Sequence, residues 1–496
     1  MAQAIATDTF SPEEYARFSE RLHAQLRTLR EVIATPGFGE GPPTLGAELE
    51  LAIADAAGAP APINRELLTA VADPHLTFEI DRFNLEYNLS PVPAAGRPFT
   101  AMREEMTRAL AAVNAHAHAR AAHVTTVGIL PSITREDLGP DNLTDLPRYR
   151  ALAAGLHRLR PEPITVRLAG REPLAFTCND VSLEGANTSF QVHLRVPPSR
   201  YADHYNAAQL ATAVALAVAG NSPLFLGHHL WDETRIALFK KVMDMRTPDE
   251  LAWHYPTRVA FGHGWMRHGI AEPFAEAVAF FAPIMPICTD EPWREGAVPA
   301  LRELRLHAGT VWRWNRAIYD PHDDGHLRIE MRALPAGPTP IDMMANAAFL
   351  LGLTVGLATR ADPPIDWVID AIPFSVAETN FYRAARDGLD ARLLWPADAP
   401  PSPREHGVRE LVDTLLPVAA DGLARLGVDD EEARTLLDII AARVAGGLTG
   451  ARWQRHALAR LEAPGVARDA ALRQLVLAYV ARAAHGDPVH TWDLPH

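Results

Sequence analysis

The sequence predicts an α+β fold with strands and helices mixed in no regular alternation. Three short stretches, 46–51, 191–195 and 328–332, place charged or metal-capable side chains two residues apart with apolar residues between them. Successive side chains of a strand point to opposite faces, so each stretch would present its polar residues on one face and pack the other. Irregular mixing of strands and helices favours α+β over a doubly wound sheet. We expect the polar sheet face to be a site rather than core.

The N-terminal elements follow from local signals. A helix is predicted over 11–33, because Ser11 is a good cap, Pro12 suits the first helical position and acidic residues follow in the first turn. Proline and glycine residues over 36–43 end this helix, and the first strand follows directly. The next predicted elements are a strand pair over 76–88, a helix over 98–122 and a strand rich in β-branched residues over 124–130.

The second half of the chain is predicted to contain two buried helices and a hairpin. Residues 205–219 and 341–357 are mostly apolar and read as helices, and 311–334 reads as a hairpin with a turn at Asp323-Asp324-Gly325. The proline-rich segment 396–403 is interpreted as a connector, and 408–484 as a helical tail.

Bulk composition limits the function classes. With a net charge of -14 the chain lacks the basic field that nonspecific nucleic-acid binding requires, which leaves small molecules or cations as partners. Cys178 and Cys288 are the only cysteines, so neither a disulfide framework nor a Cys-x-x-Cys site is indicated, and a reducing cytosol is expected. We take the apolar run over 210–219 as the longest, and it is too short to span a bilayer. The start has no export pattern, so no membrane association is expected.

Acidic residues gather on the predicted polar face. Glu48 and Glu50 share a strand face, and Glu79 and Glu86 lie in the second strand pair. Carboxylates that converge without a cation repel and have raised pKa values, so a metal is their natural partner. Oxygen ligands select Mg2+ or Mn2+ rather than zinc. His193 would add a nitrogen ligand or a phosphate contact.

Ordinary explanations remain open for each of these residues. Glu48 with Glu50 is also typical of a solvated strand face, His193 of a structural histidine, and Glu330 with Arg332 of a surface ion pair. If Glu330 and Arg332 belong to the site, the arginine would clamp a transferring phosphoryl group. The aromatic stretch 311–316 is typical either of a stacking surface for adenine or substrate, or of core.

Six motifs occur in an order that resembles one known family. They are Gly-Ala-Glu-Leu-Glu at 46–50, the acidic pair at 79 and 86, Gly-Ile-Leu-Pro at 128–131 with Arg-Tyr at 148–149, the histidine strand at 188–194, Asn-Ser-Pro at 221–223 with Thr-Arg at 234–235, and Ile-Glu-Met-Arg at 329–332. Together they resemble glutamate-cysteine ligase family 2, the carboxylate-amine ligases. The resemblance implies the glutamine synthetase and guanidino kinase fold, a curved antiparallel sheet with helices on its outer face.

The resemblance also implies roles for individual residues. Magnesium ligands would be Glu48, Glu50, Glu86 and Glu330. Further ligands or phosphate contacts would be Glu79 and His193, and phosphate clamps would be Arg235 and Arg332. Position 79 is Glu where relatives often have Asp. The domains expected are an N-terminal helical extension over 1–43, the catalytic domain over 44–395 and a C-terminal helical region over 396–496.

The implied activity joins an acid to an amine with ATP and Mg2+ or Mn2+. Glutamate is the family's usual acid, activated as an acyl phosphate, and cysteine is one of its amines. Two alternatives remain, namely a non-catalytic protein that binds a nucleotide or amino acid on this scaffold, and a phosphotransferase like the guanidino kinases. The helices over 205–219 and 341–357 leave a homodimer open. Replacing Glu48 or Glu330 by Ala is expected to remove turnover and to leave the fold intact, by relieving repulsion.

A metallohydrolase is disfavoured by the placement of the histidines. His116 with His118, and His228 with His229, lie in sequence predicted to be helix or loop, and no nearby acids complete a ligand pattern. These histidines are interpreted as surface or packing residues.

Overall fold

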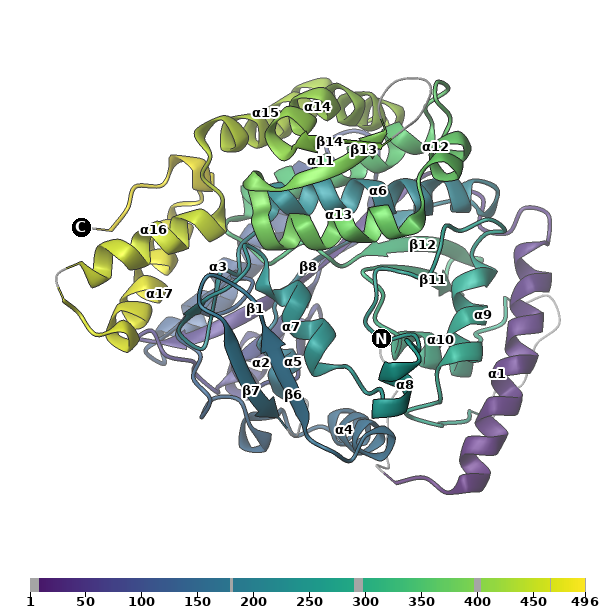
Figure 1. Ribbon diagram of the computed structural model, residues 1–496, viewed down its shortest axis with the longest axis horizontal. Helices are drawn as coiled ribbons and strands as arrows, with labels where there is room; N and C mark the ends of the chain where they lie inside the picture. Colours follow the sequence, from purple (N-terminus) through teal and green to yellow (C-terminus); the bar gives the residue numbers. More distant parts are fainter. Residues whose placement is uncertain (1–8, 179–181, 290–297, 397–402, 464, 496) are drawn as a thin grey trace.

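An eight-stranded antiparallel sheet forms the centre of the molecule (Figure 1). The computed structural model describes residues 9–178, 182–289, 298–396, 403–463 and 465–495. In spatial order the main strands are β11 (Asn315–Asp320), β12 (His326–Met331), β8 (Phe190–Arg195), β1 (Thr44–Asp55), β3 (Asn84–Asn88) and β2 (Leu76–Phe78). Two further strands, β4 (Val92–Pro93) and β5 (Ala122–Thr125), also pair with β1.

The alternating sequence pattern produces a sheet with two different faces. Leu49 in β1, Val192 in β8 and Ile329 in β12 are each at most 1% exposed, because they pack into the main hydrophobic core. The polar residues between them lie on the opposite face, as a two-residue period requires. The three predicted strand stretches are therefore confirmed, as is the hairpin formed by β11 and β12.

A layer of helices covers the apolar side of the sheet (Figure 1). Nearest the sheet are α6 (Tyr201–Ala219) and α11 (Pro340–Ala358). On these two helices pack α13 (Phe374–Asp387), α14 (Val408–Arg425) and α15 (Asp430–Gly446). Side chains of α6 also bond to the hairpin: the Tyr205 hydroxyl donates to the backbone oxygen of Asn315 over 2.7 Å, and Asn315 Nδ2 donates to Gln209 Oε1 over 2.6 Å. The helical layer thus fixes β11 as well as burying the core. The predicted α+β class is confirmed.

Helix α11 corrects the expectation that the longest apolar run is 210–219. It has 19 residues and enough apolar character to match a membrane span in length and composition, yet 94% of its most apolar window is buried inside the protein. It packs against α6, α14 and α15, so its apolar surface belongs to the core.

The remaining elements surround this two-layered centre. At one side, the predicted N-terminal helix α1 (Pro12–Ile33) packs on α9 (Ala271–Phe280) and α10 (Arg302–Gly309). On the apolar side of β1, α3 (Pro98–His118) contacts α11 and β5. The others are α2 (Asn64–Val71), α4 (Pro147–Leu159), β6 (Ile164–Leu168), β7 (Leu174–Cys178), α5 (Ser182–Gly185), β9 (Leu224–Phe225), β10 (His228–His229), α7 (Thr234–Val242), α8 (Pro248–Ala252), α12 (Ile365–Ala371), β13 (Arg392–Pro396), β14 (Pro403–Gly407), α16 (Gly450–Glu462) and α17 (Arg468–His485).

Two local predictions were wrong. The strand predicted over 124–130 ends at Thr125, and the apolar residues Ile129 and Leu130 are buried in the core without a strand partner. Apolar side chains there reflect burial of a loop, which periodicity alone does not distinguish from a strand. His228 and His229 form the short strand β10 rather than helix or loop. Most of the predicted connector, residues 397–402, lies outside the described residues.

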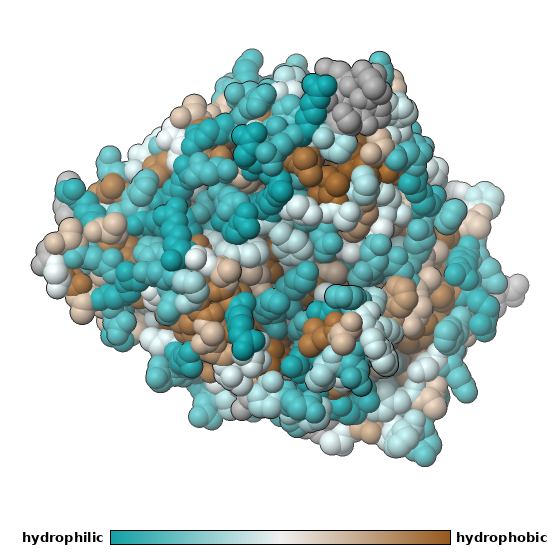
Figure 2. Space-filling model, in the orientation of Figure 1, coloured by the Kyte–Doolittle hydropathy of each residue, from teal (hydrophilic) through white to brown (hydrophobic). Residues whose placement is uncertain are grey.

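The C-terminal helices share their core with the rest of the molecule. Arg443 of α15 is 1% exposed and donates to Asp342 Oδ1 of α11 over 2.7 Å and to Asn346 Oδ1 over 2.5 Å. Asp342 also accepts a hydrogen bond from the backbone nitrogen of Val489. In Figure 2, hydrophilic residues cover the outer side of α14 and α15, while hydrophobic residues occur in separate patches. The boundary predicted at residue 396 stays a prediction, although packing is continuous across it.

Replacing Arg443 by Met is expected to destabilise the whole protein by about 3–5 kcal/mol, because Asp342 would remain buried without its cation. Urea unfolding followed by circular dichroism and by tryptophan fluorescence measures this loss. The exposed Arg434, on the same helix, serves as control when replaced by Met. Two separate unfolding transitions, with only one displaced in R443M, would contradict a shared core.

Candidate active site

Three glutamates meet on the polar face of the sheet. Glu50 of β1 lies directly opposite Glu86 of β3 in the strand register. Glu79 follows β2, and its Oε2 accepts a hydrogen bond from the backbone nitrogen of Ile80 over 2.9 Å. One carboxylate oxygen from each of Glu50, Glu79 and Glu86 lies within 4.8 Å of the other two. The structure therefore brings together acids that come from three separate strands or strand ends.

In the acidic half of the face, defined by Glu50, Glu79, Glu86 and Glu184, three of the four carboxylates have raised pKa values. Burial, followed by the charges of Glu50 and Glu184, raises the pKa of Glu79 to about 8. Burial also raises the pKa of Glu184 to about 8, with Glu50 adding to the effect. The pKa of Glu86 lies well above its usual range because of burial and the charges of Glu48, Glu79 and Glu50. Without a cation, these carboxylates resist being charged together.

In the basic half of the face, defined by Glu48, His193, Arg316, Glu330 and Arg332, the carboxylates have lowered instead of raised pKa values. Glu330 is 1% exposed and accepts hydrogen bonds from Arg316 Nη2 over 2.8 Å and from Arg332. Burial alone would raise the pKa of Glu330, but the two arginines outweigh burial and hold it well below its usual range. Two cations thus keep this carboxylate charged inside the protein.

His193 and Glu48 form the second pair of the basic half. His193 Nε2 lies 3.4 Å from Glu48 Oε1, and His193 is directly opposite Glu330 in the register. Burial raises the pKa of Glu48, while the hydrogen bond and charge of His193 lower it by more, so that the pKa is below its usual value. His193 is therefore beside two predicted ligands, as expected from the sequence.

Gln191 joins the two halves of the face. Its Nε2 donates to Glu50 Oε1 over 3.0 Å, and its Oε1 accepts a hydrogen bond from Arg332. The backbone nitrogen of Ser189 donates to the other oxygen of Glu50 over 2.6 Å. These bonds fix the direction of the Glu50 carboxylate and hold Arg332 over the sheet.

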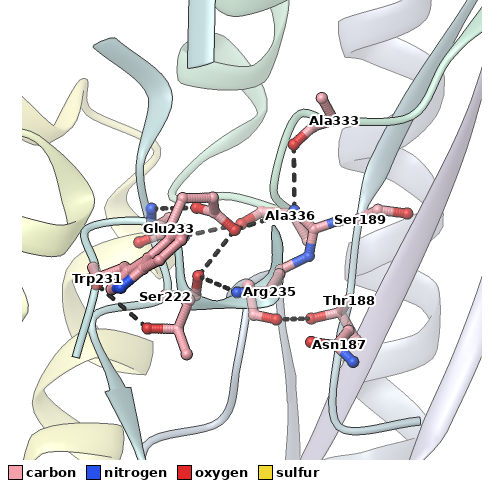
Figure 3. A network of polar contacts seen from close by, with 12 residues as sticks. Asn187, Thr188, Ser189, Ser222, Trp231, Glu233, Arg235, Ala333 and Ala336 are labelled. Atoms are coloured by element: carbon pink, nitrogen blue, oxygen red, sulfur yellow. Dashed lines mark hydrogen bonds and ion pairs between the residues drawn. The ribbon is translucent and has the colours of Figure 1, made fainter. Parts of the chain in front are cut away.

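Arg235 is placed differently from the other predicted site residues. It lies in α7 and is 3% exposed, and its guanidinium donates to Glu233 Oε1 over 3.0 Å and to the backbone oxygen of Ala333 over 3.2 Å (Figure 3). Glu233 also accepts hydrogen bonds from the Ser222 hydroxyl and from the backbone of Asn221. Among the described residues, the Arg235 guanidinium makes no hydrogen bond or ion pair with the sheet glutamates. It is bonded instead to the backbone of Ala333, the residue that follows Arg332.

Sequence reasoning missed two charged residues of this face. Arg316 was noted in the sequence only as part of an aromatic stretch. The hairpin with its turn at 323–325 would have shown it, because the antiparallel register places Arg316 opposite Glu330 in β12. Glu184 lies in the short helix α5, where no strand alternation marks it. Glu184 lies near Glu50 because two segments that are far apart in the sequence pack together, and local sequence patterns do not specify such packing.

The aromatic stretch supports the core rather than forming a stacking surface. Trp312 is 8% exposed and Trp314 is 3% exposed. Both rings contact Phe239 edge-on, at centroid distances of 6.2 and 5.8 Å. Such packing accounts for the alternating aromatics.

The donor set fits a hard divalent cation. Glu50, Glu79 and Glu86 offer oxygens at close range, and burial together with neighbouring carboxylates raises the pKa values of Glu79 and Glu86. Oxygen ligands of this kind suit Mg2+ or Mn2+. Beside them, Arg316 and Arg332 present cationic groups of the kind that bind phosphate oxygens.

Two solved structures align with most of this chain. The glutamate–cysteine ligase of Francisella tularensis, solved in complex with AMP, aligns with a TM-score of 0.57 at 11% identity, over 92% of this chain and 91% of that chain. A bifunctional glutathione synthetase from Pasteurella multocida aligns with a TM-score of 0.43 at 10% identity, over 95% of this chain and 55% of that chain. No match is found among curated proteins.

The first of these structures shows a common fold and confirms the predicted fold class. A family model, described as glutamate-cysteine ligase family 2, matches residues 44–478, which is more than half of the chain. The order of motifs, the polar sheet face and this match lead to one conclusion. The chain belongs to glutamate-cysteine ligase family 2.

Proposed function

We propose that the protein is an ATP-dependent carboxylate–amine ligase that forms a γ-glutamyl amide bond. The observation that carries this proposal is the division of one sheet face into an acidic half and a basic half. The acidic half suits a divalent cation, and the basic half suits the phosphates of a nucleotide. The family match supports the reaction class. Glutamate as the acid rests on the family, and the amine is left to experiment.

Glu50, Glu79 and Glu86 are the residues proposed to hold Mg2+ or Mn2+. A bound divalent cation would neutralise charge on the phosphates of ATP. Glu48, Glu330 and His193 stay predictions as further contacts, since Glu330 is already paired with two arginines and Glu48 with His193. This arrangement favours the first three as the principal ligands.

The reaction proposed has two steps. An oxygen of the substrate carboxylate attacks the γ-phosphorus of ATP, the bond to the β-phosphate oxygen breaks, and ADP leaves. The amine then attacks the carbonyl carbon of the acyl phosphate, loses a proton, and expels inorganic phosphate. The first step is needed because a free carboxylate is a poor electrophile. The protein needs no nucleophile of its own, so its contribution is positioning and charge stabilisation.

Arg316 and Arg332 are proposed to stabilise charge on the transferring phosphoryl group. Both are anchored by Glu330, so their guanidinium groups are held before the substrate binds. The phosphate-clamp role predicted for Arg235 is not supported by its contacts. We propose instead that Arg235, through Glu233 and Ala333, fixes the chain that follows Arg332.

Pure protein incubated with ATP, Mg2+, glutamate and hydroxylamine is expected to release ADP and to form glutamyl hydroxamate, because hydroxylamine captures an acyl phosphate. Glu86→Gln should reduce turnover by roughly 100-fold or more, since it removes one of three converging charges. Coupled ADP detection and hydroxamate colour measure the two products.

The exposed Glu66 provides a matched control, because Glu66→Gln makes the same change on the surface of α2. ATP binding without ADP release, across a panel of amines and acids, would contradict the proposal and favour a binding protein. A stable phosphorylated product that hydroxylamine does not capture would favour a phosphotransferase.

Stability without divalent metal is expected to fall as pH rises. The pKa of Glu79 is about 8 in the folded protein against 4.5 for the free side chain, so between these values the folded state binds more protons than the unfolded state. Stability therefore decreases as pH rises through this window. The melting temperature in EDTA should fall by roughly a few degrees between pH 5.5 and pH 8, because the loss of stability caused by the raised pKa of Glu79 lowers the melting temperature.

Mg2+ is expected to raise the melting temperature more at pH 8 than at pH 5.5, because fewer protons must then be displaced. In Glu86→Gln, both the pH dependence without metal and the response to Mg2+ should shrink, whereas Glu66→Gln should behave as the unsubstituted protein does. An equal response to Mg2+ at both pH values would count against these carboxylates as ligands.

Glu330→Gln is expected to destabilise the protein by about 3–5 kcal/mol, since Arg316 and Arg332 would lose their buried counter-ion. This corrects the sequence-based expectation that replacing Glu330 relieves repulsion, because its closest partners are cations. Glu86→Gln, by contrast, should stabilise the metal-free protein at pH 8. Urea titrations of both variants measure the difference, and equal signs would refute the division into two halves.

A further inference from the structure

A groove of about 680 Å3 lies apart from the sheet glutamates, between α3, β5, the start of α11 and the end of α17. The volume falls within the range of small-molecule sites, roughly 300–1,000 Å3. None of the residues assigned to the acidic or basic half lines this groove. It is therefore a second cavity, separate from the site described above.

Part of the lining of the groove is apolar and is called its floor. It comes from β5, α11, α17 and the loop before α11, namely from Val124, Ile341, Val480, Ala483 and Pro338. Val124 and Pro338 are buried, whereas Ile341, Val480 and Ala483 are half-buried. A surface of this kind gains stability when an apolar group covers it.

Two arginines of α3, Arg103 and Arg108, also line the groove. The charge of Arg108 acts on Tyr87 as well, beside Asp73 and Glu105. Glu104 is the only acidic residue among the described lining residues, so two arginines stand against one carboxylate there. This small positive excess favours an anion.

We infer that this groove binds a small amphipathic anion. A carboxylate, sulfonate or phosphate head would lie against Arg103 and Arg108, and an apolar body would cover the floor. The inference rests on charge complementarity and the apolar floor, and it holds whether or not the proposed ligase activity does.

Anilinonaphthalene sulfonate, which joins an apolar body to one sulfonate, is a suitable probe. Fluorescence titration of the full chain is expected to show one saturable site. The double variant Arg103→Glu with Arg108→Glu should weaken binding at least about tenfold. Phenylnaphthylamine, which has the same body without the sulfonate, should bind the unsubstituted protein about tenfold more weakly.

Two further variants locate the site. Ala483→Trp should fill the groove and abolish binding, whereas Arg434→Glu, the same charge reversal on the exposed side of α15, should leave binding unchanged. ATP with Mg2+ should not displace the probe. Circular dichroism and melting curves check that each variant folds. If Ala483→Trp does not fold, the double arginine variant alone tests whether the probe binds in the groove.

Three results would overturn the inference. They are the absence of a saturable site, equal binding by the unsubstituted protein and the double arginine variant, and displacement of the probe by ATP. Displacement would place the probe at the sheet face instead. A crystal soaked with the probe, showing it against Arg103 or Arg108, would support the inference directly.

Discussion

The antiparallel register of β1 with β3 and β8 is the constraint on which the rest of the site depends. It places Glu50 opposite Glu86 and Glu48 opposite Gln191, while β12 brings Glu330 opposite His193. Because side chains alternate with a period of two, a shift of one residue in any of these pairings would move the polar groups into the core. The apolar residues on the other face hold the register, so the core and the site are specified by the same pairing.

This register creates an electrostatic contrast over a short distance. On one side, Glu79, Glu86 and Glu184 are buried near one another and have raised pKa values. On the other side, burial is outweighed by Arg316 and Arg332, and Glu330 stays charged. Gln191 connects the two sides through hydrogen bonds to Glu50 and Arg332. A nucleotide that carries phosphates and a divalent cation would match this contrast, which supports the proposed reaction.

The helical layer gives the sheet a rigid support. α6 bonds to β11 through Tyr205 and Gln209, and α11 is tied to α15 by Asp342 and Arg443. The network around Glu233 and Arg235 holds the chain just beyond Arg332 (Figure 3). Side chains that must meet a substrate in fixed positions benefit from such packing, because little reorganisation is then needed when charge develops.

The sequence by itself determined the alternation of the three polar strands, the helices over 12–33 and 340–358, and the acidic character of the site. These depend on local periods and on caps, which neighbouring residues in the chain specify. From spacing and from the resemblance of the motifs, the sequence accordingly predicted a site that includes Glu48, Glu50, Glu79, Glu86, His193, Glu330 and Arg332, and their roles stay predictions.

Only the tertiary structure decided which of these residues meet and what charge they carry. A two-residue period does not say which strands are neighbours, so the pairing of Arg316 with Glu330 and the position of Glu184 were not predicted. Arg235 was expected to clamp phosphate, but its buried neighbour Glu233 binds it. Burial and the distances between charges arise from packing between distant segments, and for that reason pKa values and the groove beside α3 come from the folded molecule alone.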